Sequence, residues 1–166
     1  MTAPRKGGTP AISALERAGV EFRVHAFDND VASGDRGYGL AAAAALGVAP
    51  ERVFKTLLVA SHDTRPHQAV GIVPVTGQLA LKAMAQALGA KRVEMLAPAD
   101  AERITGYVVG GISPFGQRTP LPTVIDDACR RADTIFVSGG KRGLDIEIAP
   151  GVLIDVLGAV VAPIAN

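Results

Sequence analysis

The sequence predicts an α+β (mixed α/β) fold in which a mixed, mostly antiparallel, barrel-like β-sheet is surrounded by helices. Three observations support this prediction. The chain has 166 residues and 48% hydrophobic content, which is enough for one compact core. Helical and strand patterns are interspersed along the chain, which favours a single mixed fold. Hairpin signals join neighbouring strands, which argues against a doubly wound parallel sheet.

Local signals place the elements of the first part of the chain. The first helix is predicted to begin at Thr9-Pro10, an N-cap residue followed by proline at the first helical position, and to stop at Gly19. Alternating apolar and polar residues over 22–26 predict a strand. The alanine-rich segment 40–46 predicts a second helix, because alanine has the highest helix propensity.

The centre of the chain predicts a β-hairpin followed by shorter elements. A strand over 53–60 leads through a polar turn to a second apolar run over 69–75, the pattern of an antiparallel pair. Apolar residues at helical spacing over 81–88 predict a helix. A short strand over 92–95 and one or two helical turns over 99–105 follow.

The last third is predicted to alternate between strands and short helices. The predicted elements are, in order, a strand over 107–109, a strand over 123–126, a short helix around Cys129, a strand over 134–138, a strand over 144–148 and a closing helix over 152–157.

Composition and charge exclude several classes of function. Seventeen basic and sixteen acidic side chains give a net charge of +1, so no global field marks a protein that coats nucleic acid. The single cysteine, Cys129, and three scattered histidines give neither a disulfide framework nor metal-ligand spacing. Apolar runs are too short to span a membrane, and the N-terminus lacks the apolar core of a signal peptide. We predict a cytoplasmic protein without membrane or metal partners, with a flexible tail over 1–8 and one domain over 9–166.

Lys55 is the most informative single residue. It interrupts an apolar strand, and period-2 alternation places it on the same face as Val53, Leu57 and Val59. One interpretation is a lysine near a strand end whose ammonium group reaches the surface. The other is a cationic anchor at the floor of a pocket that receives an anionic or polar substrate.

Two glycine-rich segments are candidate ligand-binding loops. In Gly110–Pro114, paired glycines allow backbone amides to approach a ligand, although a plain turn explains the same spacing. The segment Ser138–Gly143 lacks the spacing of a nucleotide-triphosphatase loop and precedes a strand instead of a helix. A hairpin turn is the plain alternative here, but Lys141 and Arg142 suit contact with a phosphodiester backbone.

The sequence shows no convincing nucleophile and base. Ser113 and Ser138 lie in predicted loops, and no Gly-x-Ser-x-Gly elbow exists. Cys129 and His25 are more typical of packed residues than of catalysts. Asp145 follows the second glycine segment on a strand, where it faces either solvent or the same cavity as Lys55.

Three motifs in order closely resemble the YbaK family of Cys-tRNA(Pro) deacylases, relatives of the editing domain inserted in bacterial prolyl-tRNA synthetases. They are Phe54–Leu57, Thr105–Tyr107 continuing into Val109–Pro114, and Ser138–Asp145. The resemblance covers nearly the whole chain and implies that 9–166 is an aminoacyl-tRNA editing domain with a mixed sheet wrapped by helices. It also implies a trans-acting enzyme that cleaves the ester of mischarged Cys-tRNA(Pro), and also Cys-tRNA(Cys), without a cofactor.

The resemblance further implies a set of site residues and partners. The implied catalytic residues are Lys55, Gly110, Gly111 and Asp145. The implied substrate-binding residues are Phe27, Tyr38, Thr56, Ile112, Ser113, Pro114, Ser138, Gly139 and Gly140. Lys141 and Arg142 are the implied tRNA-binding residues, and the implied partners are the cysteine-carrying acceptor end of tRNA(Pro) and prolyl-tRNA synthetase.

The mechanism suggested for this family fits the absence of a triad, because the cysteine thiol of the substrate attacks its own ester. The enzyme then supplies orientation and charge stabilisation. Two residues depart from the family pattern: Phe27 stands where tyrosine is frequent, and Leu40 where an acidic residue is usual. Three alternatives remain at this level. They are a deacylase for another small residue, as in Ala-tRNA(Pro), a noncatalytic module that binds tRNA or a synthetase, and a nucleotide or phosphate binder that uses the segment Ser138–Gly143.

Overall fold

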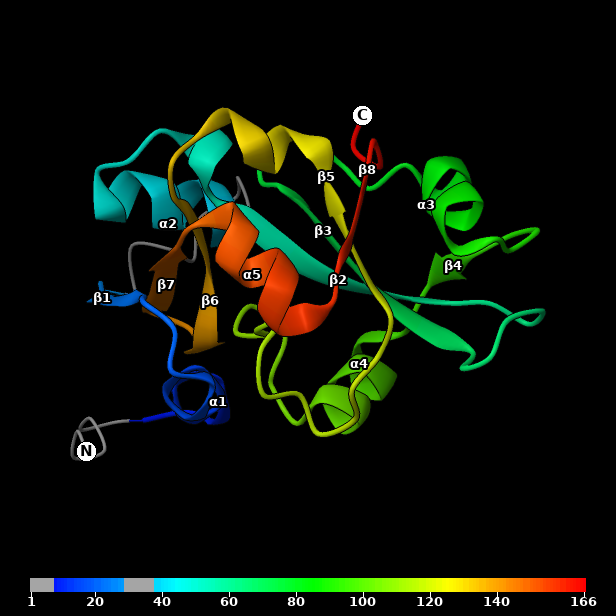
Figure 1. Cartoon of the computed structure of the whole chain (residues 1–166), viewed down its shortest axis with the longest axis horizontal. Helices are drawn as coiled ribbons and strands as arrows, with labels where there is room; N and C mark the ends of the chain where they lie inside the picture. Colours follow the sequence, from blue (N-terminus) through cyan, green and yellow to red (C-terminus); the bar gives the residue numbers. More distant parts are fainter. Residues whose placement is uncertain (1–7, 29–37) are drawn as a thin grey trace.

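The computed structural model describes residues 8–28 and 38–166 (Figure 1), so residues 1–7 of the predicted tail lie outside the described residues. The helices are α1 (Pro10–Ala18), α2 (Tyr38–Leu46), the 3₁₀ helix η2 (Pro50–Arg52), α3 (Leu81–Leu88), α4 (Pro98–Thr105), the 3₁₀ helix η3 (Asp127–Arg131) and α5 (Pro150–Leu157). The strands are β1 (Arg23–Ala26), β2 (Phe54–Ala60), β3 (Gln68–Pro74), β4 (Glu94–Met95), β5 (Thr123–Asp126), β6 (Ile135–Lys141), β7 (Leu144–Ile148) and β8 (Val160–Ala162).

The described strands form two open sheets. An antiparallel three-stranded sheet has the order β1-β7-β6, and a five-stranded sheet has the order β4-β2-β3-β5-β8. In the larger sheet β2 pairs antiparallel with β3 and β4, whereas β5 pairs parallel with β3 and β8. An isolated parallel bridge between Val53 and Phe136 links the two sheets.

The predicted α+β class is therefore confirmed, whereas a single barrel-like sheet does not form in the described residues. The smaller sheet ends in the edge strands β1 and β6, and the single bridge between Val53 and Phe136 is the pairing that the described residues form between the two sheets. The parallel pairs arise where long crossovers connect β3 to β5 and β5 to β8, as parallel strands require.

Two predicted segments have a different structure. Residues 107–109 do not form a strand, because Gly106 ends α4 in the left-handed conformation (φ 83°) and the chain continues as a turn. The second glycine segment is not a loop either. Its residues Ser138–Lys141 belong to β6, and only Arg142-Gly143 form the turn into β7.

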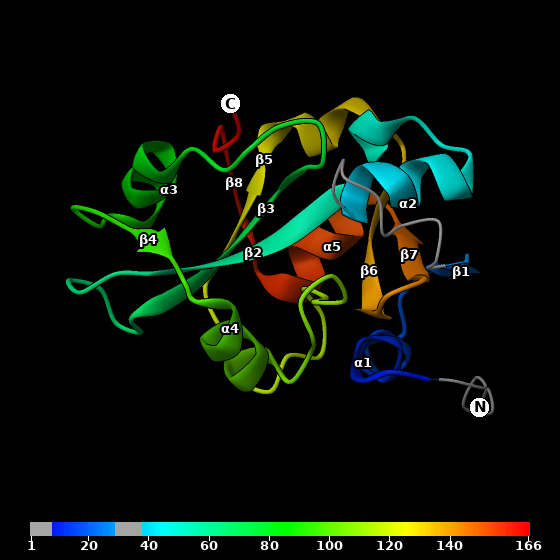
Figure 2. The ribbon, with the colours of Figure 1, turned by 180° about the vertical axis from the view of Figure 1, so that it is seen from behind.

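The core lies between the sheets and the helices that cover them. Helix α5 lies in front of β2 in Figure 1 and behind it in Figure 2, so it covers one face of the larger sheet. Its Leu153 belongs to the main apolar cluster together with Leu15 of α1 and Ile72 of β3. Met84 of α3 packs in a second cluster with Val124 of β5. None of the helices in the described ranges is long and apolar enough to cross a membrane.

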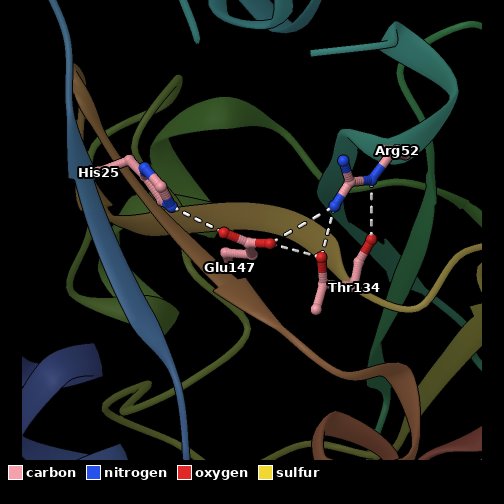
Figure 3. A network of polar contacts seen from close by, with 4 residues as sticks. All are labelled: His25, Arg52, Thr134 and Glu147. Atoms are coloured by element: carbon pink, nitrogen blue, oxygen red, sulfur yellow. Dashed lines mark hydrogen bonds and ion pairs between the residues drawn. The ribbon is translucent and has the colours of Figure 1, made fainter.

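A polar network ties η2 to the smaller sheet (Figure 3). The Glu147 carboxylate accepts a hydrogen bond from the Thr134 hydroxyl at 2.6 Å, contacts His25 Nε2 at 2.9 Å and lies 3.4 Å from Arg52 Nη2. Arg52 also donates from Nε to the Thr134 carbonyl at 3.1 Å, and its guanidinium stacks over the Phe136 ring. The hydrogen bond from Thr134 is the largest of the effects that hold the pKa of Glu147 below its usual value.

We expect Glu147→Gln to lower the free energy of unfolding at pH 7 by about 1–2 kcal/mol, because hydrogen bonds to a charged acceptor are lost. The folded pKa of Glu147 lies below the unfolded one, so this contribution is present above the unfolded value of 4.5 and is lost as the pH falls through the folded value. Urea denaturation at pH 7 and pH 3 measures it. The exposed Glu21→Gln is the control, and an equal difference between Glu147→Gln and the parent at both pH values would contradict the expectation.

Candidate active site

A cavity of about 380 Å³ opens beside β2. Its walls come from the start of α2, the edge of β2, the segment from β4 into α4, the loop after α4, and two residues of the smaller sheet. The residues that line it are Tyr38, Gly39, Leu40, Ala42, Val53, Phe54, Lys55, Thr56, Leu57, Leu58, Val75, Met95, Leu96, Pro98, Ala101, Val109, Gly110, Ile112, Ser138 and Asp145.

The cavity follows an edge of β2 that β4 leaves uncovered. Six consecutive residues, 53–58, line it. A cavity over one face of a strand would contact only alternate residues, because side chains alternate between faces. β4 pairs only with Val59 and Ala60, and the adjoining Leu96 N–H donates to the Leu58 carbonyl at 3.0 Å. Residues two apart on a strand direct their main-chain groups to the same side, so the N–H and C=O of Thr56 are directed toward this open edge.

Lys55 brings a cationic group into this cavity. It is half-buried on β2, and desolvation by burial lowers its pKa below the ordinary value. Its main chain belongs to the β2–β3 ladder, but within residues 8–28 and 38–166 its ammonium group has no hydrogen-bond or ion-pair partner. The ammonium group is therefore available to an anionic or polar ligand, as the pocket interpretation of the sequence predicts.

Asp145 lies in the same cavity and is only 3% exposed. It sits in the middle of the smaller sheet, opposite His25 on β1 and Ser138 on β6. Burial raises the pKa of its carboxyl to about 7, because the charged form loses its hydration. A carboxyl that is poised between its two charge states near neutral pH is a typical feature of ligand-binding and catalytic sites.

Thr56 adds an unpaired polar atom to the cavity. Its side chain is 9% exposed, and its Oγ1 has no hydrogen-bond partner among the described residues. An unpaired buried hydroxyl costs about 1–3 kcal/mol, which a ligand group in the cavity would offset. Thr56 is therefore a candidate ligand contact through its hydroxyl group and its main chain.

The first glycine segment forms a turn after α4, and it contributes one of its two glycines to the cavity. The Gly111 N–H donates to the Val108 carbonyl at 2.8 Å, so this amide is already occupied. Gly110 lines the cavity, as does Ile112. Ser113 and Pro114 are buried and do not line it; the Ser113 hydroxyl accepts from the Phe115 N–H at 3.2 Å.

The glycines of the second segment serve packing instead of ligand approach. Ser138 lines the cavity, whereas Gly139 and Gly140 do not. The Thr9 hydroxyl donates to the Gly139 carbonyl, and a Cβ on Gly140 would lie 2.9 Å from both Thr9 Cβ and a carbon of the Tyr107 ring. Bare backbone is required here because α1 and the segment after α4 pack against it.

Of the two neighbouring aromatic residues Phe27, which follows β1, and Tyr38, which begins α2, one lines the cavity. Tyr38 lines the cavity, while Phe27 does not and instead lies with its ring centroid 6.2 Å from that of Tyr38. The Tyr38 hydroxyl accepts from the Gly143 N–H, and the Gly143 carbonyl accepts from the Phe27 N–H at 2.9 Å. Lys141 and Arg142 are exposed at this turn.

The structure also adds site residues that the sequence pattern did not indicate. They add apolar surface to the cavity, and they are Met95, Leu96, Pro98, Ala101 and Val109. Met95 is 46% and Val109 42% exposed, unusual for apolar side chains, and this exposure is what marks them at the rim. No sequence signal distinguishes such residues from core residues before the fold is known.

The site combines an unpaired cation, a buried acid and an unpaired hydroxyl group in a mostly apolar cavity. No cluster of metal-ligating side chains occurs in the part of the chain that the structure describes. These features make the cavity a candidate binding site for a small ligand that carries both charge and apolar surface.

The chain belongs to the aminoacyl-tRNA editing domain family, whose model matches residues 40–156. A protein of Enterococcus faecalis, EbsC, described as a candidate Cys-tRNA(Pro)/Cys-tRNA(Cys) deacylase, is 43% identical over 108 residues, and the match covers 65% of this chain and 65% of that protein. The match therefore spans slightly less than two thirds of the relative.

Two solved structures share the fold. One is described as a candidate trans-editing enzyme for prolyl-tRNA synthetase, with a TM-score of 0.83, 22% identity and coverage of 95% of both chains. The other, the hypothetical protein APE2540, has a TM-score of 0.83 and 23% identity over 95% of this chain and 100% of its own. At this level of identity the likeness concerns the fold.

Proposed function

We propose that this protein is a trans-acting deacylase that removes cysteine from mischarged Cys-tRNA(Pro), and also acts on Cys-tRNA(Cys). The observation that carries the proposal is a cavity lined by both Lys55 and Asp145, in a chain of the aminoacyl-tRNA editing family. The relative at 43% identity is described with these two substrates. The volume of about 380 Å³ suits an aminoacyl group and part of the terminal ribose.

In this proposal three polar residues of the cavity, Lys55, Thr56 and Asp145, each have a partner on the substrate. The Asp145 carboxylate accepts a hydrogen bond from the α-amino group of the substrate. The positive charge of that amino group stabilises the ionised form of Asp145, which burial alone disfavours. The unpaired Thr56 hydroxyl and the Thr56 main chain at the open edge of β2 contact the aminoacyl ester. Lys55 stabilises negative charge that develops on the ester oxygens in the transition state.

We propose that the attacking group comes from the substrate. The hydroxyl groups that line the cavity belong to Tyr38, Thr56 and Ser138, and its described lining contains no histidine or cysteine that could form a nucleophile and base pair. The cysteine sulfur bonds to the carbonyl carbon, the bond from that carbon to the ribose oxygen breaks, and the thiol proton passes to the ribose oxygen. Deacylated tRNA and a cysteine thiolactone result, and water then opens the thiolactone.

Product identification tests this function. With purified protein, we expect Cys-tRNA(Pro) to be deacylated and a cysteine thiolactone to be trapped as a product. Ala-tRNA(Pro) and Ser-tRNA should react at least on the order of a hundredfold more slowly, because they lack the thiol. Comparable rates for Ala-tRNA(Pro) would contradict the thiol mechanism and favour a water-dependent deacylase for small residues. Absence of turnover with any substrate in a single-turnover assay would favour a noncatalytic binding module.

The same assay examines the proposed partner. Adding prolyl-tRNA synthetase should raise the deacylation rate at low tRNA concentration if the two proteins act together, because docking raises the effective concentration of substrate. An unchanged rate across a range of synthetase concentrations would show that the deacylase acts alone.

A further inference from the structure

Arg142 connects three segments that are far apart in the sequence. Its Nε donates a hydrogen bond to the Val109 carbonyl at 3.3 Å, and its Cζ lies 5.5 Å from the centroid of the Tyr38 ring. Val109 and Tyr38 both line the cavity. The guanidinium thus joins the turn between β6 and β7 to the loop after α4 and to the start of α2.

The guanidinium of Arg142 occupies space beside Gly110, in the loop after α4, that a side chain would fill. A Cβ on Gly110 would lie 2.9 Å from Nη2 and 3.0 Å from Cζ of Arg142, so any side chain there would displace it. Gly110 also has a φ of 90°, a conformation that other residues rarely adopt. On Gly111, a Cβ would lie 2.7 Å from the Lys141 Cα. The paired glycines therefore allow the two segments to pack in direct contact.

Val109 is held at both of its backbone groups by side chains from elsewhere in the fold. Its N–H donates to Glu102 Oε2 at 2.8 Å, from α4, and its carbonyl accepts from Arg142. Without Arg142 the Glu102 contact would remain and the carbonyl side would be released. The turn that presents Gly110 to the cavity would then lose its fixed position relative to Tyr38.

We propose that Arg142 is a positioning residue for the deacylation site. It holds the loop that contains Gly110, and the ring of Tyr38, in place at the cavity mouth. The inference rests on the proposed deacylase function and differs from a role as a tRNA-phosphate contact, which a general positive charge would fulfil. Positioning needs the planar guanidinium, because Nε and the stacked face act together, and lysine has neither.

The experiment compares Arg142→Lys and Arg142→Ala with the parent protein by two measurements. The first is hydrogen exchange of the Gly111 amide, whose bond to the Val108 carbonyl reports on the turn. The second is the separation of kcat from KM for Cys-tRNA(Pro). Arg131→Lys is the matched control, an exposed arginine of η3 that does not line the cavity.

We expect both Arg142 variants to speed exchange of the Gly111 amide and to lower kcat on the order of tenfold, with KM nearly unchanged in Arg142→Lys because the charge remains. The proposal is overturned if Arg142→Lys has the kcat of the parent, or if the Gly111 amide of either variant exchanges at the parent rate. Faster exchange of this amide without a fall in kcat also overturns it. If the parent itself fails to deacylate Cys-tRNA(Pro), the proposed function fails, while the exchange measurement still decides whether Arg142 holds the loop.

Discussion

Replacing Lys55 with methionine is expected to lower kcat/KM for Cys-tRNA(Pro) by a factor on the order of 10²–10³, the loss typical when one charge-stabilising donor is removed. The reason is that Lys55 is a cation in the cavity that is not paired with any described residue, so no described group takes its place. Measuring single-turnover deacylation for the parent and the variant tests the expectation.

Stability separates a catalytic role of Lys55 from a structural one. Burial disfavours its charged form, as its lowered pKa shows, so methionine of similar length should leave the midpoint of thermal unfolding unchanged or raise it. Lys82→Met, on the exposed surface of α3, is the matched control for loss of one positive charge. Parent-like turnover of Lys55→Met, or a large fall of its unfolding midpoint, would refute the catalytic role.

The helices were the most predictable part of the fold because their ends are set by local chemistry. Helix α1 begins after the Thr9 cap, whose side chain accepts from the Ile12 N–H, and ends at Gly19 in the left-handed conformation. The third helix matches its predicted range, 81–88. Strand β8, in contrast, was not predicted, because its pairing with β5 depends on a distant segment and leaves little local pattern.

The residue types at the candidate site could be singled out from the sequence, but which of them share one cavity could not. Lys55, Thr56, Gly110 and Asp145 line it, whereas Ser113, Pro114, Gly139 and Gly140 do not. Alternation correctly indicated that Lys55 was unusual, but it placed the cavity over one face of the strand. The cavity instead follows the strand edge, which depends on β4 being only two residues long. Sequence alone does not give the length of a neighbouring strand, so the contribution of Thr56 main-chain groups could not be foreseen.

The glycine motifs show a second limit of sequence reasoning. Paired glycines predicted a place where a ligand approaches the backbone, or else a plain turn. At Gly111 and Gly140 the close neighbours are parts of the protein itself: the Lys141 backbone at Gly111, and Thr9 with Tyr107 at Gly140. A glycine requirement is identical for a ligand and for a packed segment, so only the fold distinguishes them.

Asp145→Asn is expected to stabilise the protein increasingly as the pH rises from about 4 to about 7. The folded pKa of about 7 exceeds the unfolded value of 3.8, so in this window the folded protein keeps a proton that the unfolded chain has lost. Stability that depends on Asp145 therefore falls as the pH rises through this window and levels off above it. Since each pKa unit corresponds to about 1.4 kcal/mol, the full effect is on the order of 4 kcal/mol.

The measurement is the difference in free energy of unfolding between Asp145→Asn and the parent, from urea denaturation at pH 5 and pH 8. This difference should be larger at pH 8, because asparagine is neutral at both pH values while the parent must bury a charge. Asp133→Asn, at an exposed position, should give the same difference at both. Equal differences for Asp145→Asn at the two pH values would show that the carboxyl is not desolvated in the folded protein.

Deacylation by the same variant then separates stability from function. If Asp145 accepts the substrate's α-amino group, Asp145→Asn should raise KM for Cys-tRNA(Pro) on the order of tenfold or more, because an interaction with a charged partner is lost. A variant that is more stable at pH 8 and yet binds substrate less well would mean that the buried carboxyl is retained for the ligand at a cost to the fold. Unchanged KM would remove Asp145 from the binding site.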